Sequence, residues 1–218
     1  MKIKFLGLAA FLITTADGTK VVTDPYEPGG LDGAVTHGPL EEPADLVVVS
    51  HDHSDHNYVK GVPGDPVVVQ GPGEQTHGGI TIRTLASYHD PSRGAEWGQN
   101  FVRVIEADGM TVCHLGDLGH PLSPEDATAL GGVHILLVPV GGTWTIDANG
   151  ATAVVNRLRP RIAIPMHYRS PKVTLNMAPV DGFLADKPRV RRVKGSEIEV
   201  TKETLPEPTE IVVLESAL

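Results

Sequence analysis

The sequence predicts an α/β (α+β) fold with two mixed β-sheets, each covered by helices, in a single domain of residues 1–218. Frequent Gly and Pro, 24 and 18 residues, divide the chain into many short β-prone runs. The runs 46–49 and 135–138 are apolar without alternation, which is typical of strands covered on both faces. The stretches 11–24 and 102–117 share the order strand, Ala-Asp-Gly, strand, Asp, and each precedes one of these runs. They indicate a two-fold internal architecture, with the coincidence of two common Asp-Gly hairpins as the open alternative.

Strands are expected wherever β-prone residues are bounded by turn signals. The expected strands are 2–6, 11–15, 20–23, 46–50, 67–70, 80–85, 101–107, 110–115, 134–140, 161–165, 197–201 and 211–214. A helix is expected from Ser123, which precedes a proline and two acids, to Gly131. Asp147 is expected to cap a second helix, which ends before the next proline. Shorter helices are expected after His56 and within 180–186.

The N-terminus admits two interpretations. Lys2 and Lys4 precede an apolar run at 5–13, as in a signal peptide. No small-x-small cleavage site follows this run, and Asp17-Gly18 joins two β-prone segments, which favours a β-hairpin. No apolar run approaches the about 20 residues that a membrane span needs. We therefore expect a cytoplasmic protein that has no membrane partner.

Charge and cysteine content exclude several classes of protein. Lys and Arg total 18 against 27 Asp and Glu, which gives a formal charge of -9, and no basic run stands out. A surface that binds long nucleic acid is therefore not expected. The chain contains one cysteine, Cys113, which excludes an internal disulfide and a Cys-rich zinc site. The expected partner is a small-molecule substrate, and association into a homo-oligomer is left open.

The densest group of histidines follows the apolar run 46–49, in the segment Ser-His-Asp-His-Ser-Asp-His. In extended backbone, residues two apart share a face, so His51, His53 and Asp55 converge. A turn into a helix then directs His56 toward the same point. Imidazoles and carboxylates are ligands of Zn²⁺, Mn²⁺ and Fe²⁺. The spacing predicts a divalent metal site, against the alternative of a polar surface loop.

Three further candidate ligands occupy equivalent places in the chain. His89, Asp117 and His167 each lie a few residues past the end of an apolar, β-prone run. Taken singly, each has the alternative role of a hydrogen-bonded surface residue. Sites built on sheets collect their ligands at the C-terminal ends of strands, so the three residues together favour one shared site.

The order of these residues resembles that of the metallo-β-lactamase-fold hydrolases along nearly the whole chain. The motif His-x-His-x-Asp-His at 51–56 is followed by His89, by His-Leu-Gly-Asp at 114–117 and by Ile-Pro-Met-His at 164–167. These segments and Thr-Asp-Pro-Tyr at 23–26 are similar to those of small cytoplasmic zinc-dependent hydrolases related to the ascorbate-6-phosphate lactonases. The resemblance implies a four-layer αββα sandwich, the metallo-β-lactamase fold.

The resemblance also implies two divalent metal ions, with zinc expected and manganese or iron as alternatives. It assigns the first ion to His51, His53 and His89. It assigns the second ion to Asp55, His56 and His167, and it makes Asp117 the residue that bridges the two ions. Asp24 matches an early aspartate of the family that supports the ligand loop and does not bind metal.

The expected function is that of a binuclear metal-dependent hydrolase in which a metal-bridging hydroxide attacks a small ester or lactone. Asp55 or Asp117 is expected to orient the hydroxide and to pass a proton to the leaving group. The alternatives are a metallo-phosphodiesterase acting on a cyclic nucleotide or RNA, and a module that binds metal or ligand without turnover. Leu8 stands where many relatives have His, and Glu-Trp-Gly-Gln-Asn at 96–100 replaces a basic segment, which disfavours a phosphorylated substrate.

Several other polar residues have open roles. His114 is expected to support a ligand from behind, whereas His120 is a proton donor, a substrate contact or an ordinary loop residue. Asp52 orients a ligand imidazole or caps a local turn. The segment 141–145 and Tyr168 are candidates for the mouth of the site.

Overall fold

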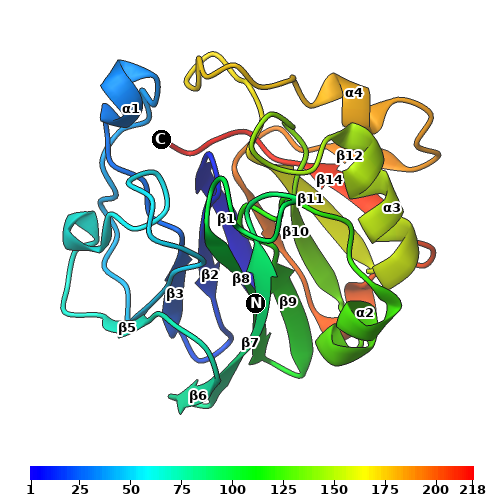
Figure 1. The fold of residues 1–218 in the computed structure, drawn as a ribbon. Coiled ribbons are helices and arrows are strands. Elements are labelled where there is room, and N and C mark those ends of the chain that lie inside the picture. Colours follow the sequence, from blue (N-terminus) through cyan, green and yellow to red (C-terminus); the bar gives the residue numbers. More distant parts are fainter.

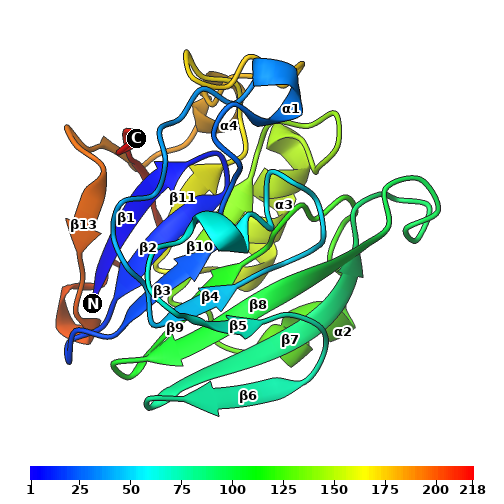
Figure 2. The ribbon, with the colours of Figure 1, turned by 90° about the vertical axis from the view of Figure 1, so that its left-hand side faces the viewer.

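The computed structural model describes residues 1–218 and contains two β-sheets that pack face to face (Figures 1 and 2). The 6-stranded sheet consists, in spatial order, of β13 (Glu197–Glu199), β1 (Lys2–Gly7), β2 (Ala10–Thr14), β3 (Lys20–Thr23), β4 (Leu46–Val48) and β5 (Val67–Val69). The 8-stranded sheet consists of β12 (Val190–Arg192), β14 (Glu210–Val213), β11 (Ile162–Met166), β10 (Ile135–Pro139), β9 (Met110–His114), β8 (Gln99–Ala107), β7 (Ile80–Tyr88) and β6 (Glu74–His77).

Both sheets are mixed, as predicted. β3, β4 and β5 run parallel, whereas β13, β1, β2 and β3 pair antiparallel. In the other sheet β6 to β9 pair antiparallel, and β9, β10, β11, β14 and β12 run parallel. The predicted hairpin β2–β3 with its parallel neighbour β4 therefore has the same order as β8–β9 with β10. Asp24 and Asp117 follow the second strand of the two hairpins, so the repeated sequence pattern corresponds to a repeated topology.

The largest hydrophobic cluster lies between the two sheets and includes fully buried residues from both, such as Phe11 and Leu137. β4 contributes to the clusters on both of its faces. Leu46 and Val48 pack between the sheets, whereas Val47 packs on the outer side. The apolar run without alternation therefore marks a strand that is covered on both faces, as predicted.

Three helices cover the 8-stranded sheet, at the right of Figure 1. These helices are α2 (Pro124–Leu130), α3 (Ala148–Leu158) and α4 (Asp181–Leu184). The two longer ones begin at the predicted caps. Ser123 forms a reciprocal capping box with Asp126, and the Asp147 side chain accepts a hydrogen bond from the Gly150 N–H at 2.8 Å.

The outer face of the 6-stranded sheet carries much less helix. The remaining turns are α1 (Gly30–Gly33), the 3₁₀ turn η1 (Val59–Gly61) and, after β13, the 3₁₀ turn η2 (Lys202–Thr204). Loop residues such as Tyr26 and Val35 cover this face instead. The segment between β3 and β4 is rich in Pro and Gly, and both residue types disfavour long helices. The helical layer is therefore thinner on this side than the predicted sandwich would suggest.

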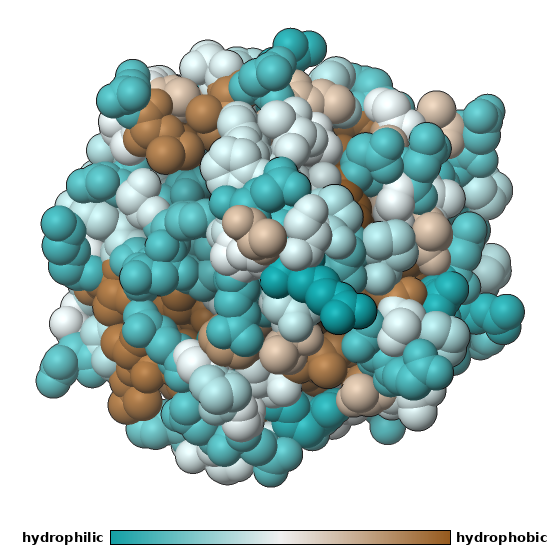
Figure 3. Space-filling view, viewed as in Figure 1, coloured by the Kyte–Doolittle hydropathy of each residue, from teal (hydrophilic) through white to brown (hydrophobic).

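The sequence does not predict the edge strands β6 and β12, because none of their residues is buried and no apolar pattern marks them. β7 also continues to Tyr88, past the predicted end at residue 85. The edge strand β5 exposes 42% of Val67 and 39% of Val68, and an apolar patch is visible in this region at the lower left of Figure 3. No helix of the structure combines the length and the apolar character that crossing a membrane requires.

Candidate metal centre

The predicted ligand loop, residues 50–56, leaves the C-terminal end of β4. His51 Nε2 lies 2.9 Å from His53 Nδ1. A tight turn follows, because the His56 N–H donates to the His53 carbonyl at 2.9 Å. This turn directs the His56 ring back to the site, where its Nε2 lies 3.5 Å from Asp55 Oδ2. The four side chains therefore converge, as their spacing predicts.

Asp117, which follows β9, lies at the centre of the site. Its Oδ2 is 3.1 Å from His89 Nε2 and 3.3 Å from the Nε2 atoms of His56 and His167. His89 follows β7 and His167 follows β11, so three strand ends of the 8-stranded sheet supply these side chains. Asp117 is buried, and only 2% of it is exposed. One carboxylate oxygen therefore faces three imidazole nitrogens.

Two groups of potential metal ligands are complete, and within each group the ligand atoms lie within 4.8 Å of one another. The groups are His51, His53 and His89, and Asp55, His56 and His167. Their membership is the one that the family resemblance implies. Asp117 Oδ2 contacts members of both groups.

Asp24, His51 and His56 also form such a group, but hydrogen bonds already engage both oxygens of Asp24. Asp24 Oδ1 accepts from the Ser50 N–H at 2.7 Å, and Oδ2 accepts from Ser50 Oγ at 2.5 Å. His56 Nδ1 donates to the same Oδ2 at 2.8 Å, which leaves His56 Nε2 directed at the site. Asp24 is therefore placed to hold the ligand loop in position.

Other hydrogen bonds orient the remaining side chains from outside the site. His51 Nδ1 lies 2.9 Å from Ser50 Oγ, and His89 Nδ1 lies 2.9 Å from the Trp144 carbonyl. The Asp117 N–H donates to Asn100 Oδ1 at 3.0 Å. Partners of this kind fix the ring orientation and hold a preformed ligand geometry.

Burial and mutual charge set the protonation of the site. Burial lowers the pKa of His51 to about 2, and burial also lowers the pKa of His167. Burial by itself raises the pKa of Asp117, but the nearby His167 and His56 reverse this and hold it well below its usual value. Burial opposes charge on His56, yet Asp117 and Asp55 raise its pKa well above the usual value. Asp117 is therefore an ionised carboxylate, the form that coordinates a metal ion.

Buried polar atoms at this point have no hydrogen-bond partner, among them His56 Nε2 and Asp117 Oδ1. Such atoms are rare in folded proteins, because leaving one unpaired costs about 1–3 kcal/mol. A divalent cation would coordinate both atoms. The donor set contains imidazoles and carboxylates without thiolate, which suits Zn²⁺, Mn²⁺ and Fe²⁺. The residues present therefore fit a metal centre.

Comparison with known proteins agrees with this geometry. A family model described as the beta-lactamase superfamily domain matches residues 2–167. A UPF0173 metal-dependent hydrolase from Carboxydothermus hydrogenoformans is 30% identical over 202 residues, which cover 78% of this chain and 85% of that protein. The chain belongs to the UPF0173 metal-dependent hydrolases of the beta-lactamase superfamily. A relative from Thermococcus kodakarensis with the same family name is 29% identical over 229 residues, covering 92% of this chain and all of that protein.

A solved structure extends the agreement to the whole chain of this hydrolase. The crystal structure of a Thermotoga maritima protein, described as a zinc-dependent hydrolase of the metallo-beta-lactamase superfamily, has a TM-score of 0.80 and 36% identity. The match covers 98% of both chains. The predicted metallo-β-lactamase fold and the prediction of a metal-dependent hydrolase are therefore confirmed.

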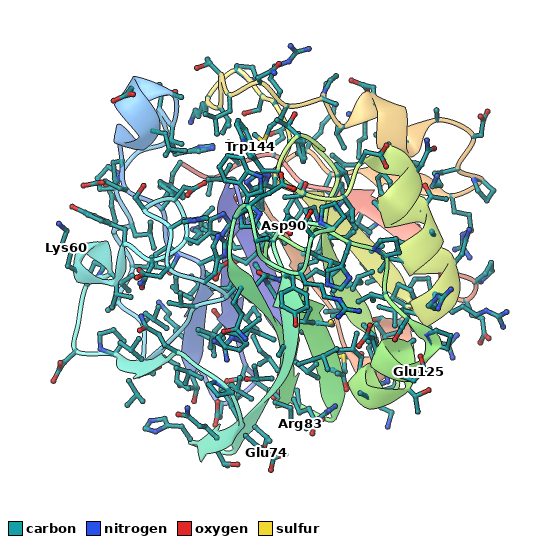
Figure 4. All side chains as sticks on the ribbon, viewed as in Figure 1. Lys60, Glu74, Arg83, Asp90, Glu125 and Trp144 are labelled. Carbon is teal, nitrogen blue, oxygen red and sulfur yellow. The ribbon has the colours of Figure 1, made fainter.

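A cavity of about 470 Å³, the metal cavity, reaches the predicted metal ligands. Its polar floor is formed by the predicted ligands His53, Asp55, His89, Asp117 and His167. The remaining lining residues are Leu31, Asp32, Ser54, Trp97, Trp144 and Leu175. Figure 4 shows Trp144 in the upper central part of the molecule, close to Asp90 in that view. The two carboxylates expected to assist proton transfer, Asp55 and Asp117, both line the cavity.

Two residues that shape the site, Asp90 and Arg103, escape the sequence analysis. Asp90 is buried and accepts hydrogen bonds from four backbone N–H groups between residues 92 and 97, so it holds the loop that carries Trp97. The turn residues Asp-Pro-Ser-Arg-Gly at 90–94 were the available signal. Arg103 of β8 donates to the Val49 carbonyl, directly before the ligand loop. No local pattern indicates this contact, because it joins the two sheets.

His114 and Asp52, two of the residues with open roles, have defined contacts. His114 Nε2 lies 2.9 Å from the Ala9 carbonyl, and His114 Nδ1 accepts from the Gly116 N–H at 3.0 Å. His114 thus links the sheets and supports the segment that leads to Asp117. Asp52 accepts from Asn57 Nδ2 at 2.7 Å, which is a contact within the loop.

The other open candidates lie away from the metal cavity, with one exception. His120 accepts from the Tyr88 N–H at 3.3 Å and does not line the cavity. Tyr168 and Leu8 line a second cavity of about 440 Å³. Of the segment 141–145, Trp144 lines the metal cavity.

Proposed function

We propose that this chain is a binuclear metal-dependent hydrolase that cleaves a small ester or lactone. The position of Asp117 carries the proposal, since its Oδ2 lies within 3.3 Å of imidazole nitrogens from both ligand groups. A carboxylate shared by two complete groups of ligands is suited to bridge two ions. A single ion would require only one of the two groups of ligands.

The two groups would each hold one ion, and zinc is the first choice for a set of imidazoles and carboxylates. The first ion would be held by His51, His53 and His89. The second ion would be held by Asp55, His56 and His167, and Asp117 would be a ligand of both ions. When bound, such ions lower the pKa of a water toward about 7 and polarise the carbonyl under attack.

Asp55 is the carboxylate best placed to move a proton. Its side chain is 12% exposed, whereas that of Asp117 is 3% exposed and faces three imidazoles. Asp55 therefore has access to the substrate side of the cavity, where it can take a proton from the attacking water and pass it to the leaving alkoxide. Asp117 is held too firmly for such a movement, so its part is to orient.

Metal content tests the binuclear part of the proposal. The protein is purified without chelator or affinity metal, and zinc, manganese and iron are measured per chain by plasma mass spectrometry. We expect close to two ions per chain. One ion or fewer, not restored by reconstitution, would contradict a binuclear site.

A substrate panel tests the chemistry. We expect the metal-loaded protein to hydrolyse p-nitrophenyl acetate and γ-butyrolactone, and to lose this activity with a chelator. His53→Ala should abolish turnover while circular dichroism stays unchanged. A preference for bis(p-nitrophenyl) phosphate would favour a phosphodiesterase, and bound metal without any turnover would favour a binding module.

A further inference from the structure

The walls of the metal cavity differ in chemistry from its floor. Four apolar side chains form the walls, namely Leu31, Trp97, Trp144 and Leu175. The lining contains no Lys or Arg, and its charged groups outside the predicted ligand set reduce to the carboxylate of Asp32. Both tryptophans of the chain border this one cavity.

We propose that the substrate is an uncharged ester or lactone whose acyl part is an apolar chain or ring, bound against the apolar wall that includes Trp97 and Trp144. This inference rests on the proposed function and adds the substrate class. Substrates that carry a phosphate or a carboxylate away from the scissile bond are rejected.

Trp97 is the strongest single observation for this class of substrate. The side chain is 45% exposed, although transfer of a large indole from water is favourable. Its loop is nevertheless ordered, because the buried carboxylate of Asp90 accepts the N–H groups of Glu96 and Trp97 at 3.1 and 2.8 Å. An exposed apolar side chain on a rigid loop beside a cavity is typical of a ligand wall.

Other parts of the wall are also held in place. The Trp144 carbonyl lies 2.9 Å from His89 Nδ1, so this tryptophan is tied directly to a predicted ligand. Leu31 is 39% exposed and has a φ of 51°, a left-handed conformation that a leucine rarely adopts. Backbone of this kind persists where the surrounding structure enforces it, often at binding sites. The apolar wall is therefore preorganised.

Charge argues against an anionic tail on the substrate. A phosphate or carboxylate at the wall would be desolvated without meeting a cation, which is unfavourable. Outside the predicted ligand set, the charged group that lines the cavity is the carboxylate of Asp32, which repels an anion. The apolar wall offers burial of apolar surface in its place, and a cavity of about 470 Å³ accommodates a ring or a short chain.

Two methyl esters of equal chain length test the inference. Methyl hexanoate and monomethyl adipate share the scissile ester and differ in a terminal carboxylate. With the metal-loaded protein we expect kcat/KM for methyl hexanoate to be at least tenfold higher than for monomethyl adipate, and higher than for methyl acetate. Equal values for the hexanoate and the adipate would overturn the inference and leave the proposed function intact.

Variants locate the preference at the wall. Trp97→Ala and Trp144→Ala should each lower kcat/KM for methyl hexanoate about tenfold and change that for methyl acetate less than twofold. Val190→Ala is the control, because Val190 is an apolar residue of similar exposure, 38%, on the edge strand β12 and does not line the cavity. An equal loss on both esters in the tryptophan variants would contradict a role in substrate selection.

Tryptophan fluorescence separates this inference from the proposed function. A chelator removes the metal, so the treated protein binds methyl hexanoate without hydrolysing it, and the ester then serves as a ligand. We expect a saturable blue shift in Trp97→Phe and in Trp144→Phe, each of which retains one tryptophan, and no shift with monomethyl adipate. A blue shift without hydrolysis by the metal-loaded protein would refute the hydrolase alone, and the absence of a shift would refute the apolar site.

Discussion

The two β-sheets supply the side chains of the candidate metal centre in different ways. The 6-stranded sheet provides its four side chains from a single loop, residues 50–56, which follows β4. The 8-stranded sheet provides one side chain after each of β7, β9 and β11, which are His89, Asp117 and His167. The side chains from residues 50–56, the loop half of the site, depend on local backbone geometry. His89, Asp117 and His167, the strand-end half, depend on the register of distant strands. The difference shows which ligands a short motif can specify and which need the whole fold.

Contacts between the sheets align the two halves. Arg103 of β8 donates to the Val49 carbonyl at the start of the ligand loop, and His114 of β9 lies 2.9 Å from the Ala9 carbonyl. Within the 8-stranded sheet, Asn100 Oδ1 accepts the Asp117 N–H. These groups act on the backbone beside the ligands, so they determine how the loop half meets the strand-end half.

The largest effect is expected for Asp117→Ala, because Asp117 is the residue that faces both ligand groups. Bound metal should fall from two ions to one or fewer, and kcat/KM for ester hydrolysis should fall at least about a hundredfold. Asp117→Asn retains the shape and removes the charge, so it should be nearly as inactive. Two bound ions together with a tenth or more of the activity in Asp117→Ala would contradict the bridging role.

Two variants of the loop half should separate metal binding from folding. His56→Ala removes a fully buried ring that is bonded to Asp24, and it should lower the free energy of unfolding of the metal-free protein by about 2 kcal/mol or more. His53→Ala affects a half-buried ring and should cost less than about 1 kcal/mol. Both should lose metal. Urea unfolding with a chelator present measures the difference, and equal destabilisation would show that the loop is not anchored through His56.

Arg103 tests the alignment of the two halves. Burial lowers the pKa of its guanidinium to about 10, so it stays charged at neutral pH, and it donates to two carbonyls and to Thr84 Oγ1. Arg103→Leu should lower the free energy of unfolding by about 3 kcal/mol, because these acceptors lose their donor. Arg103→Lys should recover part of the loss. Arg191→Leu, which removes an exposed ion pair with Glu210, is the control and should cost less than about 1 kcal/mol.

The same comparison explains how much the sequence predicts. The loop ligands follow from alternation and a turn, which are local, so spacing alone brings them together. The strand-end ligands are single residues, and the sequence indicates them only through their equivalent positions after apolar runs. Most strands were predicted because burial leaves an apolar pattern, whereas the exposed edge strands β6 and β12 carry no such pattern.

The cavity wall lies beyond local prediction for a related reason. Trp97 and Trp144 are distant in sequence, and they meet at one cavity only because β7 and β10 lie in one sheet. Likewise, no sequence pattern indicates the role of Arg103, because its hydrogen-bond acceptors belong to other strands and loops. Contacts that depend on sheet packing become visible only in the fold.

The smallest effect is expected for Ser50→Ala, which weakens the support of the loop half without removing a ligand. Ser50 Oγ lies between Asp24 Oδ2 and His51 Nδ1, at 2.5 and 2.9 Å, so it transmits the orientation of Asp24 to the His51 ring. Its loss should reduce metal affinity about tenfold and lower the free energy of unfolding by about 1 kcal/mol, because His51 Nδ1 loses its partner whereas the Ser50 N–H still holds Asp24. Competition with a chromophoric chelator measures the affinity, with Ser196→Ala, a serine that does not line the cavity, as the control. An unchanged affinity would mean that the turn of the loop alone orients His51, and the loop half would then be independent of the sheet from which Asp24 projects.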